Sequence, residues 1–191
     1  MQACRLIAED LACRRGDRVL FSRLSLALGP GEALHVRGPN GVGKSSLLRL
    51  LAGLLPPFAG TVAREGAVAL LDERPALDPH LPLGKALAFW ASLDGSRVDP
   101  ARLGLADLLD VPVRYLSTGQ KKRAALTRVL AQAAPLWLLD EPLNGLDREA
   151  VGLVEALIAE HCAMGGIAVI ASHQPFGLPS SRALELGAVP A

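Results

Sequence analysis

A glycine-rich segment that ends in a lysine and two hydroxyls offers the clearest chemistry in the sequence: Gly38-Pro39-Asn40-Gly41-Val42-Gly43-Lys44-Ser45-Ser46. Glycines lack a Cβ, so consecutive backbone N–H groups can curl around an anion, and a helix that begins there presents its positive dipole end. The spacing G-x-x-x-x-G-K-[ST] predicts a phosphate-binding loop, in which Lys44 reaches the β- and γ-phosphates and Ser45 ligates Mg²⁺. An ordinary glycine-rich turn is the alternative. The apolar strand pattern before the segment and the leucine-rich helix pattern after it favour the loop.

Two adjacent carboxylates, Asp140 and Glu141, follow the apolar run at 136–139. A buried strand would deliver them to the carboxyl edge of a parallel sheet, where ligands bind in open α/β folds. Neighbouring carboxylates repel each other unless a cation lies close by, and the phosphate loop implies one. We expect Asp140 to hold the Mg²⁺ shell and Glu141 to deprotonate the attacking water. A solvated strand end is the alternative interpretation.

A second anion-binding pattern lies in Leu116-Ser117-Thr118-Gly119-Gln120, with Lys121, Lys122 and Arg123 directly after it. A hydroxyl and a glycine at a helix start form a nest of N–H groups suited to a γ-phosphate. A capped helix would explain the same residues. We interpret the three cations as a solvated helix face and not as a nucleic-acid patch.

These segments together resemble the ATP-binding cassette (ABC) ATPases. Residues 116–120 are similar to the family's LSGGQ signature, with Thr118 in place of the first glycine. Asn144-Gly145-Leu146-Asp147 resembles its D-loop, and Ser172-His173 stands where the family has a switch histidine. The resemblance implies that Lys44, Glu141 and His173 are catalytic. It also implies that residues 117–120 close the ATP of a second subunit, and that Asp147 belongs to the D-loop.

Two positions depart from the pattern of transporter-type cassettes. Cys13 and Arg14 stand near the place of the aromatic residue that stacks on adenine, and the chain's only tyrosine, Tyr115, lies far along the sequence. Residues 72–75, Asp-Glu-Arg-Pro, stand where a glutamine usually follows a core strand. Stacking on the base would then be weak, or an aliphatic or arginine side chain would supply it. Glu73 would either complete the Mg²⁺ shell or lie in an exposed loop.

The elements that position these residues alternate between strand and helix patterns. We predict strands at 5–8, 19–21, 24–28, 33–36, 67–71, 136–139 and 167–171, and helices at 43–55, 83–93, 100–109, 119–133 and after a cap at Asp147. Pro56-Pro57 is expected to stop the first helix. The pattern predicts an α/β fold with a mainly parallel core sheet and an inserted helical lobe. The resemblance implies that this fold is of the P-loop NTPase, ABC nucleotide-binding type, with N-terminal antiparallel strands and an inserted helical subdomain. A single ATP-binding domain is expected over 1–191, with the helical subdomain at roughly 74–130 and its proline-punctuated part at 74–116.

Composition narrows the class of protein. The 191 residues carry 20 Lys plus Arg and 19 Asp plus Glu, a formal charge of +1, so no basic field indicates a nucleic-acid partner. Charged residues and prolines interrupt every apolar stretch before the roughly 18 residues that a membrane span needs. The three cysteines match no metal or haem-attachment spacing. With no signal-peptide pattern at the N-terminus, we expect a cytosolic globular domain.

Several short sequence segments, among them residues 86–90, 135–142 and 172–178, resemble the cassette ATPases of bacterial cytochrome c maturation, the CcmA family. That resemblance implies a peripheral subunit on the cytoplasmic face of the inner membrane, a homodimer of ATPase subunits, and integral partners of the CcmB and CcmC kind. It further implies a role in haem export or in release of a haem-loaded chaperone. Three alternatives stay open: a transporter ATPase for another substrate, a soluble cassette acting on ribosomes or DNA, and a small-molecule kinase.

Overall fold

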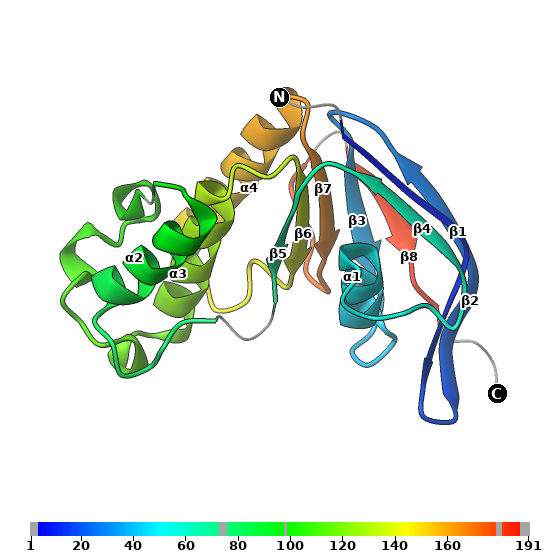
Figure 1. The fold of residues 1–191 in the computed structure, drawn as a ribbon, viewed down its shortest axis with the longest axis horizontal. Coiled ribbons are helices and arrows are strands. Elements are labelled where there is room, and N and C mark those ends of the chain that lie inside the picture. Colours follow the sequence, from blue (N-terminus) through cyan, green and yellow to red (C-terminus); the bar gives the residue numbers. More distant parts are fainter. Residues whose placement is uncertain (1–3, 73–75, 98, 179–180, 188–191) are drawn as a thin grey trace.

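The computed structural model describes residues 4–72, 76–97, 99–178 and 181–187, and its centre is a five-stranded parallel sheet (Figure 1). Its strand order is β5-β6-β7-β3-β8. The strands are β3 (Ala33–Arg37), β5 (Val68–Leu71), β6 (Leu136–Asp140), β7 (Ile167–Ala171) and β8 (Ser181–Glu185). Parallel strands end at a common edge. The segments that follow β3, β6 and β7 therefore meet there.

The middle of this sheet is buried on both faces, which explains why its strands are continuous apolar runs. Along β6, Leu136 and Leu138 pack in one hydrophobic cluster with the N-terminal strands, whereas Trp137 and Leu139 pack in a second cluster with the helices. All five residues of β6 and all five of β7 are buried. A one-residue shift in register would exchange the two faces, so packing fixes the alignment of these strands.

A three-stranded antiparallel sheet of order β2-β1-β4 covers one face of the molecule. It contains β1 (Arg5–Arg15), β2 (Arg18–Leu28) and β4 (Ala59–Glu65). The short strands predicted at 5–8, 19–21 and 24–28 are parts of these longer ribbons. β4 and β8 were not predicted, because few of their side chains are buried and the apolar alternation on which prediction depends is weak in both.

Helix α1 (Lys44–Ala52) lies between the two sheets and is buried on several sides, at Leu47, Leu48, Leu50 and Leu51. It ends earlier than predicted. Gly53 adopts a left-handed conformation, with φ 76°, and its N–H bonds back to the last turn. The glycine, and not the proline pair, therefore stops the helix, three residues before Pro56.

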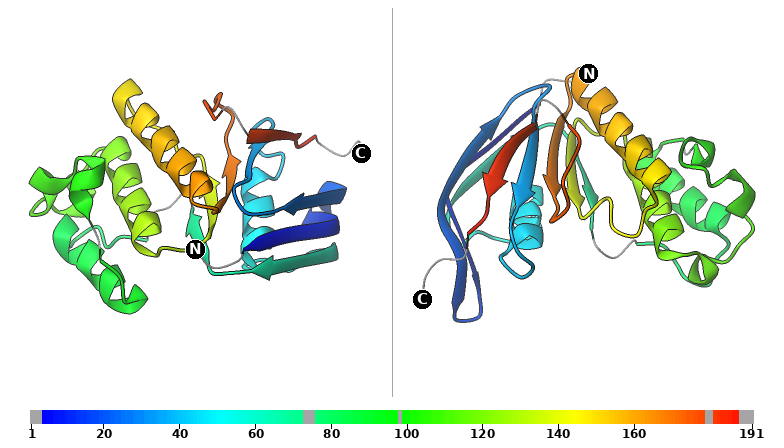
Figure 2. Two further views of the ribbon diagram at one scale, coloured as in Figure 1. Left: turned by 90° about the horizontal axis from the view of Figure 1, so that it is seen from above. Right: turned by 180° about the vertical axis from the view of Figure 1, so that it is seen from behind.

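The remaining helices form a lobe on the side of the parallel sheet that faces away from the antiparallel strands (Figures 1 and 2). They are α2 (Leu83–Asp94), α3 (Thr118–Ala131) and α4 (Arg148–Ala163). The helix predicted at 100–109 is wrong. Two short 3₁₀ turns, Pro100–Leu103 and Ala106–Leu108, take its place, because Gly104 turns left-handed with φ 63° and ends the first of them. Arg74, the expected start of the lobe, lies outside the described residues.

Candidate functional site

The predicted phosphate loop connects β3 to α1, as the strand–loop–helix arrangement requires. Gly38, Gly41 and Gly43 have positive φ of 141°, 79° and 114°. A Cβ on Gly38 would lie 2.6 Å from the carbonyl oxygen of Leu186, and one on Gly43 would lie 3.2 Å from the side chain of Leu20. The backbone conformation therefore favours glycine at all three positions, and the space also demands it at Gly38 and Gly43.

Lys44 is folded over its own loop and is only 6% exposed. Its Nζ donates hydrogen bonds to the carbonyl oxygens of Gly38 (2.8 Å) and Pro39 (3.3 Å). The same Nζ lies 3.7 Å from Oε1 of Glu141. The carbonyl and carboxylate partners offset the cost of burying this ammonium and fix its position. The ammonium faces the space above the loop.

Asp140 ends β6 and is 2% exposed. Burial raises the pKa of its carboxyl, and Asp72 and Glu141 add to the rise, whereas a hydrogen bond from Ser45 and the charge of Lys122 oppose it. Its Oδ1 has no hydrogen-bond partner among the described residues. A buried carboxylate oxygen without a donor, beside a serine hydroxyl, is a donor set that suits a hard divalent cation.

Glu141 has a left-handed backbone, with φ 45°, which is uncommon for a residue with a side chain. Its N–H donates to the carbonyl oxygen of Ala171 at 2.8 Å, which anchors it to the end of β7. Its Oε2 lies 3.0 Å from Nδ1 of His173, a half-exposed ring that follows the same strand. The carboxylate thus lies between a lysine and a histidine from different segments.

These groups surround one cavity of about 620 Å³. It is lined by Leu20, Asn40, Gly41, Gly43, Lys44, Ser45, Ser46, Thr118, Lys122, Asp140, Glu141, Asn144 and His173. The structure therefore brings together residues predicted from the phosphate loop, the acidic strand end and the switch histidine. Thr118 of the signature segment, which was expected to act on the ATP of a second subunit, lines the cavity of its own chain as well. Gly38, Pro39 and Val42 belong to the loop without lining the cavity, and Ser117, Gly119, Gln120 and Asp147 lie outside its lining.

The signature segment, residues 117–120, caps α3. Ser117 Oγ accepts from the N–H of Gln120 at 3.2 Å, and Gln120 Oε1 accepts from the N–H of Ser117 at 2.8 Å, a capping box. Ser117 and Thr118 are exposed. A Cβ on Gly119 would lie 2.4 Å from the carbonyl oxygen of Gly145, so the signature packs directly on the predicted D-loop. Asp147 caps α4 by accepting from the N–H of Ala150 at 2.8 Å.

Lys122 was misjudged from the sequence. It was interpreted as part of a solvated basic face, yet it is 8% exposed and lines the cavity, with Nζ 3.4 Å from the carbonyl oxygen of Asp140. A signal was available, because Lys122 precedes buried Leu126 and Val129 by four and seven residues, the spacing of one helix face. Leu20 was also missed as a lining residue, since nothing local to it indicates a site. Asn144 belongs to the predicted D-loop segment but was not expected to line the cavity.

The residues at the position expected to hold adenine, Cys13 and Arg14, contact other parts of the protein. Cys13 is buried and contacts the hydroxyl of Ser46, whereas the guanidinium of Arg14 lies 4.4 Å from the centre of the Phe58 ring. Neither Cys13 nor Arg14 lines the cavity. Tyr115 is 69% exposed and stacks with Arg114 on the helical lobe, far from the loop in sequence. Glu73, the expected further Mg²⁺ ligand, lies outside the described residues.

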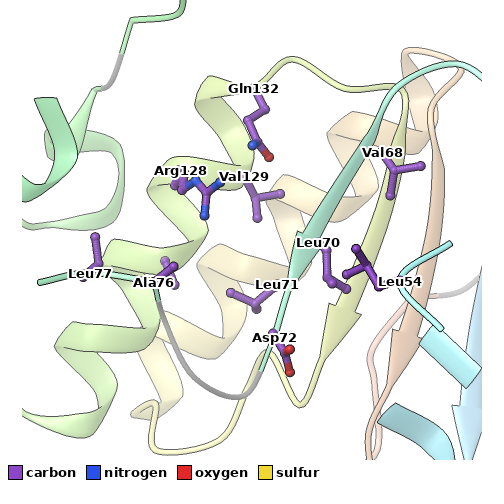
Figure 3. A pocket seen from close by; sticks show the side chains of 11 residues that line it. Leu54, Val68, Leu70, Leu71, Asp72, Ala76, Leu77, Arg128, Val129 and Gln132 are labelled. Atoms are coloured by element: carbon purple, nitrogen blue, oxygen red, sulfur yellow. The ribbon is translucent and has the colours of Figure 1, made fainter. Parts of the chain in front are cut away.

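A separate groove of about 340 Å³ runs between the edge strand β5 and α3 (Figure 3). Leu70 and Leu71 line it from β5, and Arg128 and Val129 line it from α3. Arg128 lies 3.9 Å from Asp94 and stacks on Trp90 at 3.5 Å from the ring centre. The groove combines apolar side chains with the polar groups of Arg128, Gln132 and Asp72, and Asp72 is paired with Arg49 at 2.9 Å.

Comparison with known proteins identifies the family. The ABC transporter family model matches residues 21–144, which include the phosphate loop, the signature segment and the acidic strand end. The chain belongs to the ABC transporter family. It is 62% identical over 186 residues to the cytochrome c biogenesis ATP-binding export protein CcmA of Novosphingobium aromaticivorans, covering 97% of each chain. It is 54% identical to the protein of the same name from Sphingopyxis alaskensis, covering 95% of this chain and 96% of that one.

Solved ABC structures share the fold. An ABC transporter ATP-binding protein from Pyrococcus furiosus superposes with a TM-score of 0.82 at 24% identity, covering 95% of this chain and 97% of that one. A chain of a metal-chelate type ABC transporter in an inward-facing conformation gives 0.78 at 23% identity, covering 97% and 80%. The predicted family and fold class are confirmed, and so is the enzyme class, an ATP hydrolase of the ABC type. In the part of the chain that the structure describes, no helix is both long and apolar enough to cross a bilayer.

Proposed function

We propose that this chain is the ATP-hydrolysing subunit of an ABC-type complex that drives haem export, or release of a haem-loaded chaperone, in cytochrome c maturation. The observation that carries the hydrolytic part is the convergence of Lys44, Asp140, Glu141 and His173 on one cavity above the phosphate loop. The identity to proteins named for cytochrome c biogenesis supports the pathway. It also supports a peripheral location at the cytoplasmic face of the bacterial inner membrane.

The loop residues 38–46 bind the phosphates of ATP in this proposal. Lys44 exchanges its contacts with the loop carbonyls for phosphate oxygens, which carry more negative charge. Ser45 and Asp140 would hold Mg²⁺, which would supply positive charge to offset the charge that develops on the phosphates. The hydroxyl of Ser45 and the carboxylate of Asp140 would supply two oxygen ligands, the donor type that Mg²⁺ prefers.

Glu141 is the general base for the attacking water. Lys44 and His173 hold its carboxylate from two sides, so its position is fixed before the substrate arrives. A histidine ring can donate from both nitrogens only when both are protonated, so His173 would hold Glu141 through Nδ1 and a γ-phosphate oxygen through Nε2 as the imidazolium. His173 therefore places both the base and the phosphate in one geometry.

A homodimer completes the site. Ser117 and Thr118 are exposed at the start of α3, where N–H groups and the positive dipole end favour an anion. The signature segment of one subunit closes the ATP held on the phosphate loop of its twin. The packing of Gly119 on Gly145 fixes the signature to the D-loop, so Asp147 and the signature approach the partner as one surface.

The integral membrane subunits, of the CcmB and CcmC kind, are proposed to dock a short helix in the groove between β5 and α3 (Figure 3). The groove offers apolar contact from Leu70 and Val129 and a guanidinium from Arg128 for an acidic side chain. The groove borders both the core sheet and the helical lobe. A helix bound there would therefore move when the sheet and the lobe move relative to each other. We propose no nucleic-acid partner, since the net charge is +1.

The substitution Glu141→Gln tests this function. The variant keeps the shape of the side chain but loses the base, so it should bind ATP with normal affinity and hydrolyse it at least about 100-fold more slowly. It should accumulate as an ATP-bound dimer in light scattering and fail to restore c-type cytochromes to a strain that lacks the gene. Normal hydrolysis by the variant contradicts the base assignment. Full ATPase loss with unimpaired cytochrome assembly contradicts the pathway.

A further inference from the structure

Lys122 is the one cation lining the nucleotide cavity, among the described residues, that comes from the helical lobe. It lies on α3, one turn after Thr118, and its side chain crosses from that helix to the end of β6. Its Nζ donates to the carbonyl oxygen of Asp140 at 3.4 Å. Burial of an ammonium is costly unless polar groups receive it, and the carbonyl of Asp140 is one of the partners of Lys122.

The carbonyl that Lys122 contacts belongs to the peptide unit between Asp140 and Glu141. The N–H of the same peptide unit donates to the carbonyl oxygen of Ala171 at 2.8 Å. Both polar groups of this one peptide are therefore fixed, one by α3 and the other by β7. The plane of a peptide sets the direction of the next residue, because only φ and ψ rotate freely on either side of it.

Glu141, which follows this peptide, has a backbone conformation that persists only when neighbouring groups hold it. Glu141 has φ 45°, in the left-handed region where a side chain is disfavoured, and such residues persist only where the surroundings hold them. Its carboxylate nonetheless lies within 3.0 Å of His173 and 3.7 Å of Lys44. Rotation of the preceding peptide would let the backbone relax and would carry the carboxylate away from both partners.

We propose that Lys122 is a positioning residue for Glu141, which it holds in its left-handed conformation by fixing the peptide carbonyl of Asp140. This inference rests on the proposed role of Glu141 as the base. Lys122 and the signature segment lie on the same helix. The contact between Lys122 and the Asp140 carbonyl therefore makes the orientation of the Glu141 carboxylate depend on the position of α3. A shift of α3 away from β6 would release the carbonyl and disable hydrolysis without any change in the phosphate loop.

The test is a double-mutant cycle of Lys122→Met and Glu141→Gln, followed by single-turnover hydrolysis and ATP affinity. Lys122→Met alone should lower kcat by about 10- to 100-fold, the usual effect of a displaced catalytic group, with ATP affinity changed less than about twofold. In the Glu141→Gln background, the same change should cost less than about threefold, because the base it positions is already gone. Lys122→Arg, which keeps a charged donor, should recover most of the activity.

Lys121→Met is the matched control, since Lys121 donates instead to the carbonyl oxygen of Arg114 on the lobe surface, and it should hydrolyse ATP normally. An equal loss from Lys122→Met in both backgrounds would overturn the proposal, because it would show a general structural role. Full activity of Lys122→Met beside an inactive Glu141→Gln would overturn the proposal and leave the function intact. Normal hydrolysis by Glu141→Gln would overturn both. If Lys122→Met unfolds without cooperativity, Lys122→Gln replaces it in the same cycle.

Discussion

Gly119→Ala should separate ATP binding from hydrolysis. Alanine normally stabilises a helix by about 1 kcal/mol relative to glycine. At position 119, however, the new Cβ would lie 2.4 Å from the carbonyl oxygen of Gly145, about 1 Å inside normal contact. The signature helix and the D-loop must move apart to relieve this contact. We expect the net effect to be a destabilisation of about 1–3 kcal/mol, as for other overpacked sites.

The displacement has a functional cost because the signature acts across the dimer. A shift of about 1 Å in a positioning group can lower a rate by roughly 100-fold. The phosphate loop is unchanged, so binding of a fluorescent ATP analogue to the monomer should stay within about twofold of normal. Steady-state ATPase activity and dimer formation should both fall, and the midpoint of thermal unfolding should fall by several degrees.

Gly152→Ala is the control for this prediction. Gly152 lies on the exposed side of α4, and a Cβ there would meet nothing within 4 Å. The same substitution should therefore stabilise the protein by about 0.5–1 kcal/mol and leave hydrolysis unchanged. If Gly119→Ala behaves like Gly152→Ala in stability and rate, the contact between the signature and the D-loop has no part in function.

Two other predictions concern stability. Asp147→Ala removes the cap of α4 and should lower the free energy of unfolding by about 1 kcal/mol, or the unfolding midpoint by about 2–4 °C. Asp147→Asn should lose much less stability because it keeps the hydrogen-bond acceptor. Equal losses in calorimetry would refute the role of Asp147 as a cap. Burial lowers the pKa of His161, which stacks on Trp137, so unfolding releases a histidine that binds a proton more readily. The free energy of unfolding should therefore fall as pH drops below about 6.5, the ordinary pKa at which the histidine of the unfolded chain takes up its proton, by at most about 1.4 kcal/mol per pH unit. His161→Phe should reduce this slope in urea unfolding below that pH, and an unchanged slope would refute the role of His161.

Local patterns were enough to predict the parts of the site that act through the backbone. The phosphate loop, the cap at Asp147 and the capped start of α3 each depend on residues within a few positions of one another. The strands β6 and β7 were predictable because burial on both faces requires a continuous apolar run. β4 and β8 carry no such requirement along most of their length, and their pairing partners lie far away in the sequence.

The tertiary structure decided how Glu141, His173 and Lys122 lie relative to one another. The sequence by itself determined that a carboxylate follows a buried strand, that a histidine follows another and that a lysine follows the signature. Only the order of β6 beside β7 and the packing of α3 decided that Glu141 meets His173 at 3.0 Å and that Lys122 reaches the carbonyl of Asp140. The physical reason is that a motif fixes the chemistry of a short segment through local backbone geometry, whereas the distance between segments depends on how the whole core packs.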